Sequence, residues 1–415
     1  MKLLFLANTC PLPATNGLTM RSSSVLSALS ALRHRVFLLS YVEAEPLPET
    51  EQDISRLCYD HKLLKADLSN VSSPGQYWNR LKNLWHSSPY GLLRYQSATM
   101  SKALRDVVNE DRFDAIVCDT IDSTIHLASD LRVPVIVNNH NVEHLILERY
   151  LPYEHNPAKK LYGWLEAKKL RRWETEACRR GSLVWVCSDF DLDILQELCP
   201  GVRFRVVPNA IDIDSYVPSS TAAVEPIVLY SGGMDWYPNR DAVEFFVRQV
   251  MPELERQVPN VQFVVAGRAP SVEFRRRLER RNVTFTGTVP DMRPEIARAA
   301  VCVVPLRIGS GTRLKILEAA ALSKPVVSTT LGAEGLEFVP AKEIAIADEP
   351  AAFATRIAEL LRNPELRLEM GRAARTRVSA KYGFESLRRS IDASLREVFG
   401  ARTQTEQAAE CVVSR

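Results

Sequence analysis

Short apolar runs alternate with stretches of helical periodicity along almost the whole chain. Runs without strict apolar–polar alternation predict strands that are buried on both faces, and the strand–helix–strand order predicts parallel sheets. These runs are too many for one sheet, so the pattern predicts an α/β protein with two Rossmann-like, doubly wound domains. The predicted strands are 2–7, 35–40, 115–118, 134–138, 183–187, 227–232, 261–267, 301–306, 325–329 and 343–347. The predicted helices are 17–32, 97–109, 157–180, 189–198, 240–257, 313–322 and 351–361.

A stretch rich in Pro, Ser and Asp, "VVPNAIDIDSYVPSSTAAVE", divides the two halves of this pattern. Such a composition is typical of a connection between domains. The segment 42–94 has weak periodicity and several prolines, which favours an irregular, partly helical insertion. The predicted organisation is an N-terminal domain (1–205), a linker (206–225), a C-terminal domain (226–382), a helix crossing back to the first domain (383–400) and a disordered tail (401–415).

The composition narrows the classes of function. With 415 residues, 46% of them hydrophobic, the chain is long enough for two domains with full cores. The formal net charge of +3 does not indicate a nucleic-acid-binding protein. The eight cysteines include no C-x-x-C pair, so we expect free thiols in a reducing compartment and no zinc site.

The N-terminal segment "MKLLFLANTC" has an apolar core that is too short for a signal peptide. No run reaches the about 18–20 apolar residues that a membrane span requires. We therefore expect a cytoplasmic protein, with the inner face of the membrane as a further location.

The segment "VCVVPLRIGSGTRLKILEAAAL" contains the strongest functional signal. Its loop joins a predicted strand to a predicted helix, and Gly309 and Gly311 would let the backbone approach a ligand closely. The amides of Gly311, Thr312 and Arg313 would lie at the helix N-terminus, which attracts anions through unpaired N–H groups and the helix dipole. Arg313 and Lys315 would add positive charge. The loop is therefore predicted to bind a diphosphate.

Glu318 lies three residues beyond Lys315, on the same face of the predicted helix. A carboxylate one turn past a diphosphate site could accept hydrogen bonds from a ribose diol. Together the two features predict a site for a nucleoside diphosphate. The alternative is an exposed helix on which Lys315 and Glu318 form an ordinary ion pair.

Further loops with functional signals follow other predicted strands. "YSGGMDWYPNR" and "CPLPATNGLTMR" each place a glycine turn before a helix, at Gly233 and at Gly17. In "VIVNNHNVEH", His140 is one of four polar residues that directly follow a buried strand. Because α/β folds bind ligands outside the carboxyl ends of their strands, we expect these loops to line a site. The alternative for His140 is a purely structural histidine.

Six segments resemble the GT-B glycosyltransferases, in particular the group 1 (family 4) retaining class of exopolysaccharide or cell-surface glycan type. They are "HNVEH", "VPNAID", "SGGMDWYPNRDAVEFF", "FVVAGRAP", "VTFTGTVPDM" and "IGSGTRLKILEAAALSKPVVST". The resemblance covers nearly the whole chain. It implies two Rossmann-like domains facing each other across a cleft, and transfer of a sugar from a UDP- or GDP-linked donor to a saccharide, lipid-linked or small-molecule acceptor.

The resemblance also implies roles for individual residues. His140 would reach the donor sugar, and Arg313 and Lys315 would stabilise the leaving diphosphate, so these three would be catalytic. The implied reaction needs neither a metal nor a cofactor and involves no nucleic acid. The implied donor-binding residues are Asn16, Gly17, Gly233, Asn239, Gly267, Arg268, Ser310, Gly311, Thr312, Arg313 and Glu318.

The sequence departs from the family pattern in two places. The family often carries two glutamates eight positions apart, and the position eight before Glu318 is Ser310. An Arg/Lys pair is expected after the first strand of the donor domain, where Asn239 or Arg240 would have to substitute. The donor sugar and the retaining outcome therefore stay open. For an inverting reaction Glu143 would be the candidate base, with helix capping as its alternative role.

The segment 158–180, "AKKLYGWLEAKKLRRWETEACRR", predicts a basic amphipathic helix with interleaved Trp and Tyr residues. Such a helix suits contact with anionic lipid, and therefore a lipid-linked acceptor. The alternative is a surface helix with a stripe that packs on the core. That stripe consists of Leu161, Trp164 or Leu165, Leu170, Trp173 and Ala177.

Two other functions use the same two-domain plan. A non-hydrolysing sugar-nucleotide epimerase would need several carboxylates and a histidine around the sugar, and few of these are evident in the sequence. A non-catalytic GT-B subunit would have no need to retain Glu318 and the glycine loops.

Overall fold

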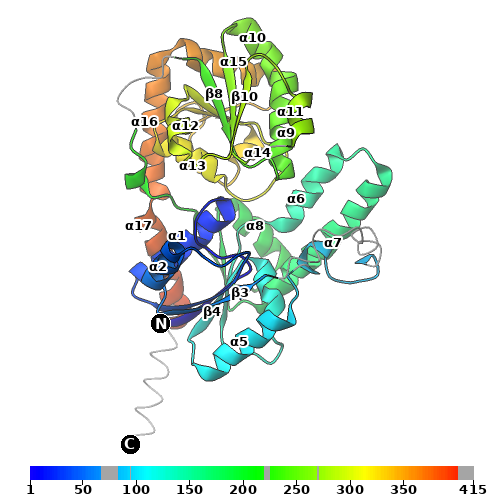
Figure 1. The fold of residues 1–415 in the computed structure, drawn as a ribbon, viewed down its shortest axis with the longest axis vertical. Helices are drawn as coiled ribbons and strands as arrows, with labels where there is room; N and C mark the ends of the chain where they lie inside the picture. The colour runs from blue at the N-terminus through cyan, green and yellow to red at the C-terminus, as the bar shows by residue number, and fades with distance from the viewer. Residues whose placement is uncertain (67–82, 94, 219–224, 269–270, 401–415) are drawn as a thin grey trace, which may run out of the picture. The chain divides into compact units, whose positions relative to one another are not determined.

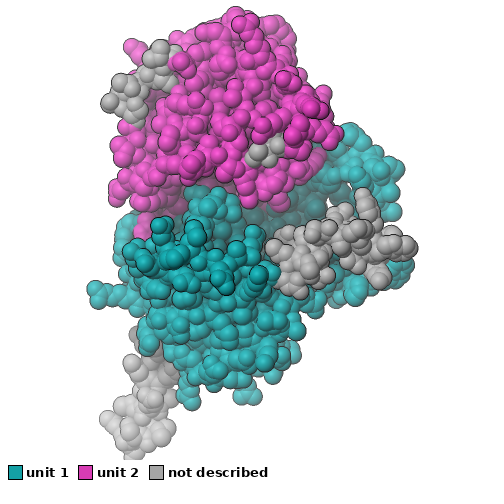
Figure 2. Space-filling model, viewed as in Figure 1, with its two compact units in different colours: residues 1–209, 385–415 teal, residues 210–384 magenta. Residues whose placement is uncertain are grey.

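The computed structural model describes residues 1–66, 83–93, 95–218, 225–268 and 271–400. The chain divides into two compact units, traced in Figure 1 and coloured separately in Figure 2. Unit 1 contains residues 1–209 together with the chain from residue 385, and unit 2 contains residues 210–384. The predicted disordered tail, 401–415, lies outside the described residues.

Unit 1 is built on a sheet of parallel strands in the order β3-β2-β1-β4-β5-β6-β7. The strand order reverses between β1 and β4, which is the point where doubly wound sheets bind ligands. The residues from Leu3 to Ala7 are completely buried, as expected of a strand covered on both faces. The described strands are β1 (Lys2–Ala7), β2 (Arg35–Val42), β3 (Asp60–Lys65), β4 (Ala115–Asp119), β5 (Val135–Asn138), β6 (Leu183–Val186) and β7 (Phe204–Val206).

Helices cover both faces of this sheet. Leu4 and Leu6 of β1 belong to a core that also contains residues of α5, α7 and α8. On the opposite face, the indole Nε1 of the fully buried Trp185 donates to the Ser394 hydroxyl of α17 (3.0 Å). The described helices are α1 (Gly17–Ala31), α2 (Pro48–Leu57), α4 (Tyr90–Leu93), α5 (Ala98–Glu110), α6 (Glu143–Tyr150), α7 (Pro157–Arg180), α8 (Asp189–Leu198) and α17 (Phe384–Leu395), with short turns η2 (Ile121–His126), η3 (Leu151–Tyr153) and η6 (Arg396–Gly400).

Unit 2 repeats the plan with a parallel sheet in the order β10-β9-β8-β11-β12-β13. Here the strand order reverses between β8 and β11, so the loops after these two strands are the ones that a ligand would meet. The described strands are β8 (Ile227–Ser231), β9 (Gln262–Ala266), β10 (Val283–Gly287), β11 (Val301–Val304), β12 (Val326–Ser328) and β13 (Ala345–Ile346).

The sheet of unit 2 also has helices on both faces, as Figure 1 shows around β8 and β10. On one face, the ring of Phe246 stacks on Phe263 of β9 (4.2 Å between centroids) and meets Phe353 of α15 edge-on. No helix among the described residues is both long and apolar enough to cross a bilayer. The described helices are η4 (Ile213–Ser215), α9 (Tyr237–Phe245), η5 (Phe246–Val250), α10 (Met251–Gln257), α11 (Val272–Arg277), α12 (Arg293–Arg298), α13 (Leu314–Ala321), α14 (Thr330–Ala333), α15 (Pro350–Arg362) and α16 (Pro364–Lys381).

The prediction of two doubly wound, parallel-sheet domains is confirmed. Three strands were missing from it: β3, β7 and β10. The predicted single helix 240–257 is wrong in detail, because a π-helical turn, η5, separates α9 from α10. The described parts of segment 42–94 are more regular than predicted, since they contain α2 and β3.

Candidate functional site

In unit 2, the backbone after β8 packs directly against the backbone after β9. Gly232 (φ 151°) and Gly267 (φ 140°) both lie in the region of positive φ that favours glycine. A Cβ on Gly267 would lie only 2.3 Å from the carbonyl oxygen of Gly232, so no larger residue fits there. The turn containing Gly233 and the turn containing Gly267, both predicted to bind the donor, therefore meet at the carboxyl edge of the sheet.

Lys315 extends from the first turn of α13 toward this glycine turn. Its Nζ donates to the hydroxyl of Tyr230 in β8 (3.0 Å) and to Oδ1 of Asn239 (3.3 Å). Asn239 also donates to the carbonyl oxygen of Gly233 (2.8 Å). A Cβ on Gly232 would lie 2.8 Å from Nζ of Lys315, so the missing side chain gives the ammonium group access to the turn.

The environment of Lys315 makes its charge sensitive to pH near neutrality. Burial, followed by the nearby charge of Arg313, lowers the pKa of Lys315 to about 7, while Glu318 acts in the opposite direction. An anion bound beside Nζ would favour the charged form and raise this pKa. Lys315 is therefore suited to gain a proton when an anion binds.

Arg313 braces the loop between β11 and α13. It is the N-cap residue of α13, and its guanidinium donates to the carbonyl oxygens of Ser310 (2.5 Å) and Gly311. A Cβ on Gly309 would lie 3.0 Å from Nη2 of Arg313. The helix begins at Leu314, one residue later than predicted. In this conformation the Arg313 guanidinium contacts the carbonyls of its own loop, and its contact with a diphosphate stays a prediction, as does that of Thr312.

Glu318 lies one turn beyond Lys315 and accepts a hydrogen bond from the hydroxyl of Tyr216 (3.0 Å). Burial raises the pKa of Glu318, although the bond from Tyr216 and the charge of Lys315 act in the opposite direction. Lys315 and Glu318 therefore have different hydrogen-bond partners and are both partly buried. The alternative of an exposed helix with an ordinary Lys315–Glu318 ion pair does not fit these contacts.

The remaining predicted residue of unit 2, Arg268, forms an exposed ion pair with Asp235 (3.0 Å). Sequence reasoning missed Tyr230 and Tyr216 as partners of the site. Tyr230 was concealed in an apolar run, and Tyr216 lies in the segment 206–225 that was interpreted as a linker. Of these two tyrosines, only Tyr230 had a position in the sequence that could have indicated a site, because it lies one residue before the end of β8.

A buried polar cluster occupies the carboxyl ends of β4 and β5 in unit 1. Oδ1 of Asp119 accepts from Nδ2 of Asn138 (2.8 Å) and lies 2.9 Å from Nε2 of His140. The other carboxylate oxygen accepts from the Ser22 hydroxyl (2.5 Å), and Oδ1 of Asn138 accepts from Arg21 (2.8 Å). All five side chains belong to residues that are at most 8% exposed. We call these residues, Arg21, Ser22, Asp119, Asn138 and His140, the polar cluster.

Arg21 fixes the polar cluster to the end of the sheet. Its Nη1 donates to the carbonyl oxygen of Val207 (2.9 Å) and to Oδ1 of Asn209 (3.1 Å), just beyond β7. Asn138 connects Arg21 to Asp119, because its amide accepts from the guanidinium and donates to the carboxylate. Sequence reasoning placed His140 at the sheet edge but missed Asp119, because the predicted strand ended at Cys118.

Asn16 and Gly17 lie at the start of α1, as predicted. Oδ1 of Asn16 accepts from the amide of Thr19 (3.1 Å), and the Thr19 hydroxyl accepts from the amide of Asn16 (3.1 Å), which forms a capping box. Glu143, the candidate base for an inverting reaction, lies in the first turn of α6 and accepts from Nδ2 of Asn141 (2.9 Å). Their roles toward a substrate stay predictions.

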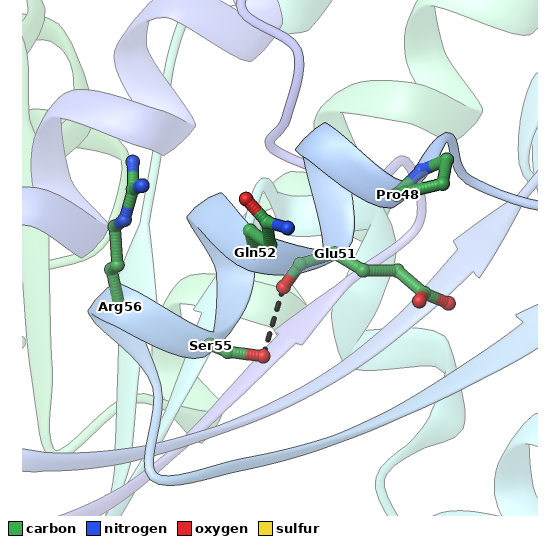
Figure 3. A pocket seen from close by; sticks show the side chains of 5 residues that line it. All are labelled: Pro48, Glu51, Gln52, Ser55 and Arg56. Carbon is green, nitrogen blue, oxygen red and sulfur yellow. Dashed lines mark hydrogen bonds between the residues drawn. The ribbon is translucent and has the colours of Figure 1, made fainter.

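A separate hollow of about 540 Å³ lies along the outer side of α2, and Figure 3 shows its lining. Its lining residues all come from this one helix, so no second element contributes to the lining. None of them belongs to the polar cluster or to the loops of unit 2. The hollow is therefore a surface feature and not the candidate site.

Comparisons with known proteins identify the family of this chain. Residues 15–215 match the family described as Glycosyltransferase Family 4, and residues 225–363 match Glycosyl transferases group 1, which together span most of the chain. The two parallel-sheet units and these family matches thus define a GT-B glycosyltransferase. Within that class, the chain belongs to the group 1, family 4 enzymes.

Two curated relatives show similarity in sequence. An uncharacterized 44.6 kDa protein in the cps region of Klebsiella pneumoniae is 20% identical over 395 residues, which covers 87% of this chain and 91% of that protein. A GDP-mannose-dependent α-(1-6)-phosphatidylinositol monomannoside mannosyltransferase of Mycolicibacterium smegmatis is 25% identical over 231 residues, which covers 50% of this chain and 59% of that protein.

Two solved structures show the same fold at low sequence identity. Sucrose-phosphate synthase from Thermosynechococcus elongatus superposes with a TM-score of 0.73 at 18% identity, covering 97% of this chain and 100% of that structure. HepE from Anabaena, solved in complex with UDP and glucose, gives a TM-score of 0.65 at 15% identity, covering 95% and 99%. These likenesses bear on the fold alone.

Proposed function

We propose that the protein transfers a sugar from a UDP- or GDP-linked donor to a hydroxyl group of a saccharide, lipid-linked or small-molecule acceptor. The observation that carries this proposal is the order of groups around α13. Glycine backbone, the ammonium of Lys315 and the carboxylate of Glu318 follow one another at the point where the strand order of unit 2 reverses. A diphosphate, followed by a ribose, matches that order.

Each group has a physical role in this proposal. The glycine turns after β8 and β11 let main-chain amides approach the phosphates, and Lys315 gains a proton as the diphosphate binds. As the bond to the anomeric carbon breaks, negative charge grows on the leaving diphosphate, and this fixed cation stabilises it. Glu318 accepts hydrogen bonds from the ribose hydroxyls, a role that Tyr216 supports by holding the carboxylate in place. In this proposal His140 contacts the donor sugar. The reaction retains the configuration at the anomeric carbon and requires no metal ion.

The relatives support the class of donor. HepE was solved with UDP, whereas the mycobacterial relative is named for GDP-mannose, so both bases are proposed here. The Klebsiella relative is named for its place in a cps region, which supports a role in the assembly of polysaccharide or another cell-surface glycan.

Calorimetric titration with UDP and GDP tests the donor site. Wild-type protein is expected to bind one of the two nucleotides, and Glu318→Ala to bind it about 10- to 100-fold more weakly, because hydrogen bonds to a charged group contribute roughly 1.5–3 kcal/mol. The control is Glu349→Ala, an exposed glutamate of the same unit whose side chain does not cap α15. Equal affinities for wild type and Glu318→Ala would refute the ribose role.

A product assay then separates transfer from the related activities. Nucleotide sugars are supplied with and without lipid-extract or saccharide acceptors, and with EDTA in a parallel series. A transferase forms a glycosylated product only when acceptor is present, and the proposal expects the same rate with EDTA. An epimeric nucleotide sugar formed without acceptor would instead identify an epimerase. Nucleotide binding without any product from a broad panel would favour a non-catalytic subunit.

A further inference from the structure

The N-terminal half of α7 turns large apolar side chains away from the protein. Leu161 is 60% exposed and Trp164 is 44% exposed. Farther along the same helix, Trp173 and Ala177 pack on the core of unit 1. The packing stripe that the sequence offered as an alternative therefore explains the inner side of α7 but not Leu161 and Trp164.

The fold also removes most of the negative charge from the outer side of α7. Glu166 is 6% exposed and accepts from Nδ2 of Asn83 (3.0 Å) and from the amide of Tyr90 (2.7 Å). Glu174 is completely buried and accepts from the amide of Glu143 (2.9 Å). Two of the three glutamates of this helix thus point inward and satisfy buried donors.

Several exposed cations of α7 lie beside these apolar side chains. Residues spaced three or four apart lie on one side of a helix, which puts Lys160, Trp164, Lys168 and Arg171 together. The ammonium of Lys168 lies 3.6 Å from the centre of the Trp164 ring. Glu176, the remaining glutamate, is paired with Arg172 (3.0 Å) at the edge of this surface. We call Lys160, Leu161, Trp164, Lys168, Arg171 and Arg172 the α7 face.

A further exposed aromatic side chain belongs to a segment that is tied to the same helix. Trp85 is 84% exposed, and it lies two residues after Asn83, which is held by Glu166. Nζ of Lys169 also donates to the carbonyl oxygen of Asn83 (2.6 Å). The contacts of Asn83 therefore keep this exposed tryptophan on a segment anchored to α7.

We propose that the α7 face docks on an anionic phospholipid membrane. Trp and Leu side chains partition into the boundary between headgroups and acyl chains, and Lys and Arg side chains attract the lipid phosphates. The outward charge of the α7 face is complementary to such a surface. A nucleic acid or an acidic polysaccharide would engage the cations but would give Leu161 and Trp164 no apolar environment.

Flotation of the full-length protein with lipid vesicles tests this proposal. The vesicles contain either phosphatidylcholine alone or phosphatidylcholine with about a third of phosphatidylglycerol. The test variant is Lys168→Glu with Arg171→Glu, and the matched control is Lys102→Glu with Arg105→Glu. The control pair lies on α5 of the same unit, is exposed, has the same spacing and changes the net charge equally.

Wild type and control are expected to float with the anionic vesicles, less so at high salt, and neither with phosphatidylcholine alone. The test variant should partition at least about 30-fold more weakly, because each of its two replaced basic residues contributes roughly 1 kcal/mol near an anionic surface. Quenching of tryptophan fluorescence by brominated lipid should decrease in Trp164→Phe. Equal flotation of test variant and wild type, an equal loss in the control, or unchanged quenching in Trp164→Phe would overturn the proposal. So would concentration-dependent self-association in place of vesicle binding.

Discussion

A single buried carboxylate, that of Asp119, holds three neighbouring side chains of the polar cluster. Ser22, Asn138 and His140 all direct a polar atom at it, and its charge strengthens each of these hydrogen bonds. Because Nε2 of His140 lies against Asp119, the contact fixes the orientation of the imidazole ring. Asp119 is thus a positioning residue for His140, whose own contact with the sugar is part of the proposed function.

Replacing Asp119 by Asn tests this positioning. The amide keeps the shape but turns N–H groups toward a donor, so at least one buried group loses its partner. The free energy of unfolding should fall by about 1–3 kcal/mol. The transfer rate should fall while nucleotide affinity, which belongs to unit 2, stays the same. Urea unfolding, titration and initial rates measure these quantities, with the exposed Asp130→Asn as control. Loss of stability with an unchanged rate would mean that Asp119 is only structural.

Lys315 predicts a pH dependence of nucleotide binding. Its pKa is about 7 in the folded protein against an ordinary 10.5, so it is charged at pH 6 and mostly neutral at pH 8. A bound diphosphate raises this pKa, so binding above pH 7 takes up a proton, and affinity should fall by up to about tenfold per pH unit there. Calorimetry in buffers of different ionisation enthalpy measures the uptake.

Lys315→Met should abolish this proton uptake and flatten the pH profile of nucleotide affinity. The titration of the nucleotide's own phosphates is the same in both proteins, so comparison with this variant removes that contribution. The exposed Lys342→Met is the control and should behave like wild type.

The depressed pKa of Lys315 also affects the stability of the protein in the absence of ligand. The unfolded chain binds the proton up to about pH 10.5, so the stability of unit 2 should rise between pH 7 and 10.5. A wild-type profile in Lys315→Met would show that another group titrates.

At the scale of elements, the carboxyl edge of unit 2 depends on two turns that touch through their main chains. The close approach of Gly267 to Gly232 aligns the loop after β9 with the loop after β8. Gly267→Ala combines a strained positive φ with a steric clash. It should lower the free energy of unfolding by more than the roughly 1–3 kcal/mol of backbone strain alone, and should weaken nucleotide binding.

Gly287→Ala is the matched control for this prediction. Gly287 lies in the same unit and also has a positive φ, 77°, but an added Cβ would meet nothing within 4 Å. Its alanine variant therefore reports the backbone strain without the clash. Chemical unfolding and nucleotide titration of both variants separate the two effects, and equal losses in the two would argue against a special role of the close approach.

The strands that the sequence analysis missed all lie at the edges of the two sheets. Central strands such as β1 are buried on both faces and stand out as apolar runs, and all of them were predicted. The missed strands β3, β7 and β10 lie at the edges of their sheets, where half-exposed segments such as "DHKLLK" and "VTFTG" lack such a run. The same holds for the candidate site. The glycine turns were predicted from short sequence segments, whereas the contacts of Asp119 and Tyr216 arise from tertiary packing and were missed.

At the scale of the whole molecule, unit 1 is assembled from two separate parts of the chain. α17 completes the face of the sheet that carries Trp185, and Ile391 of this helix is fully buried. Ile391→Ala should destabilise unit 1 by about 2–5 kcal/mol. Hydrogen exchange should therefore accelerate at the amides of β1 and β6 but not at those of β11 and β12. Arg389→Ala, on the exposed side of α17, should change neither. Accelerated exchange throughout both sheets would contradict this assignment.

The split arrangement of unit 1 has a consequence for biosynthesis. Residues 210–384 form a continuous segment, so unit 2 can close its sheet as soon as it leaves the ribosome. The sheet of unit 1 is completed later, because α17, which contacts Trp185, is synthesised only after unit 2. A nascent chain arrested within unit 2 would therefore expose that tryptophan and the apolar side chains around it.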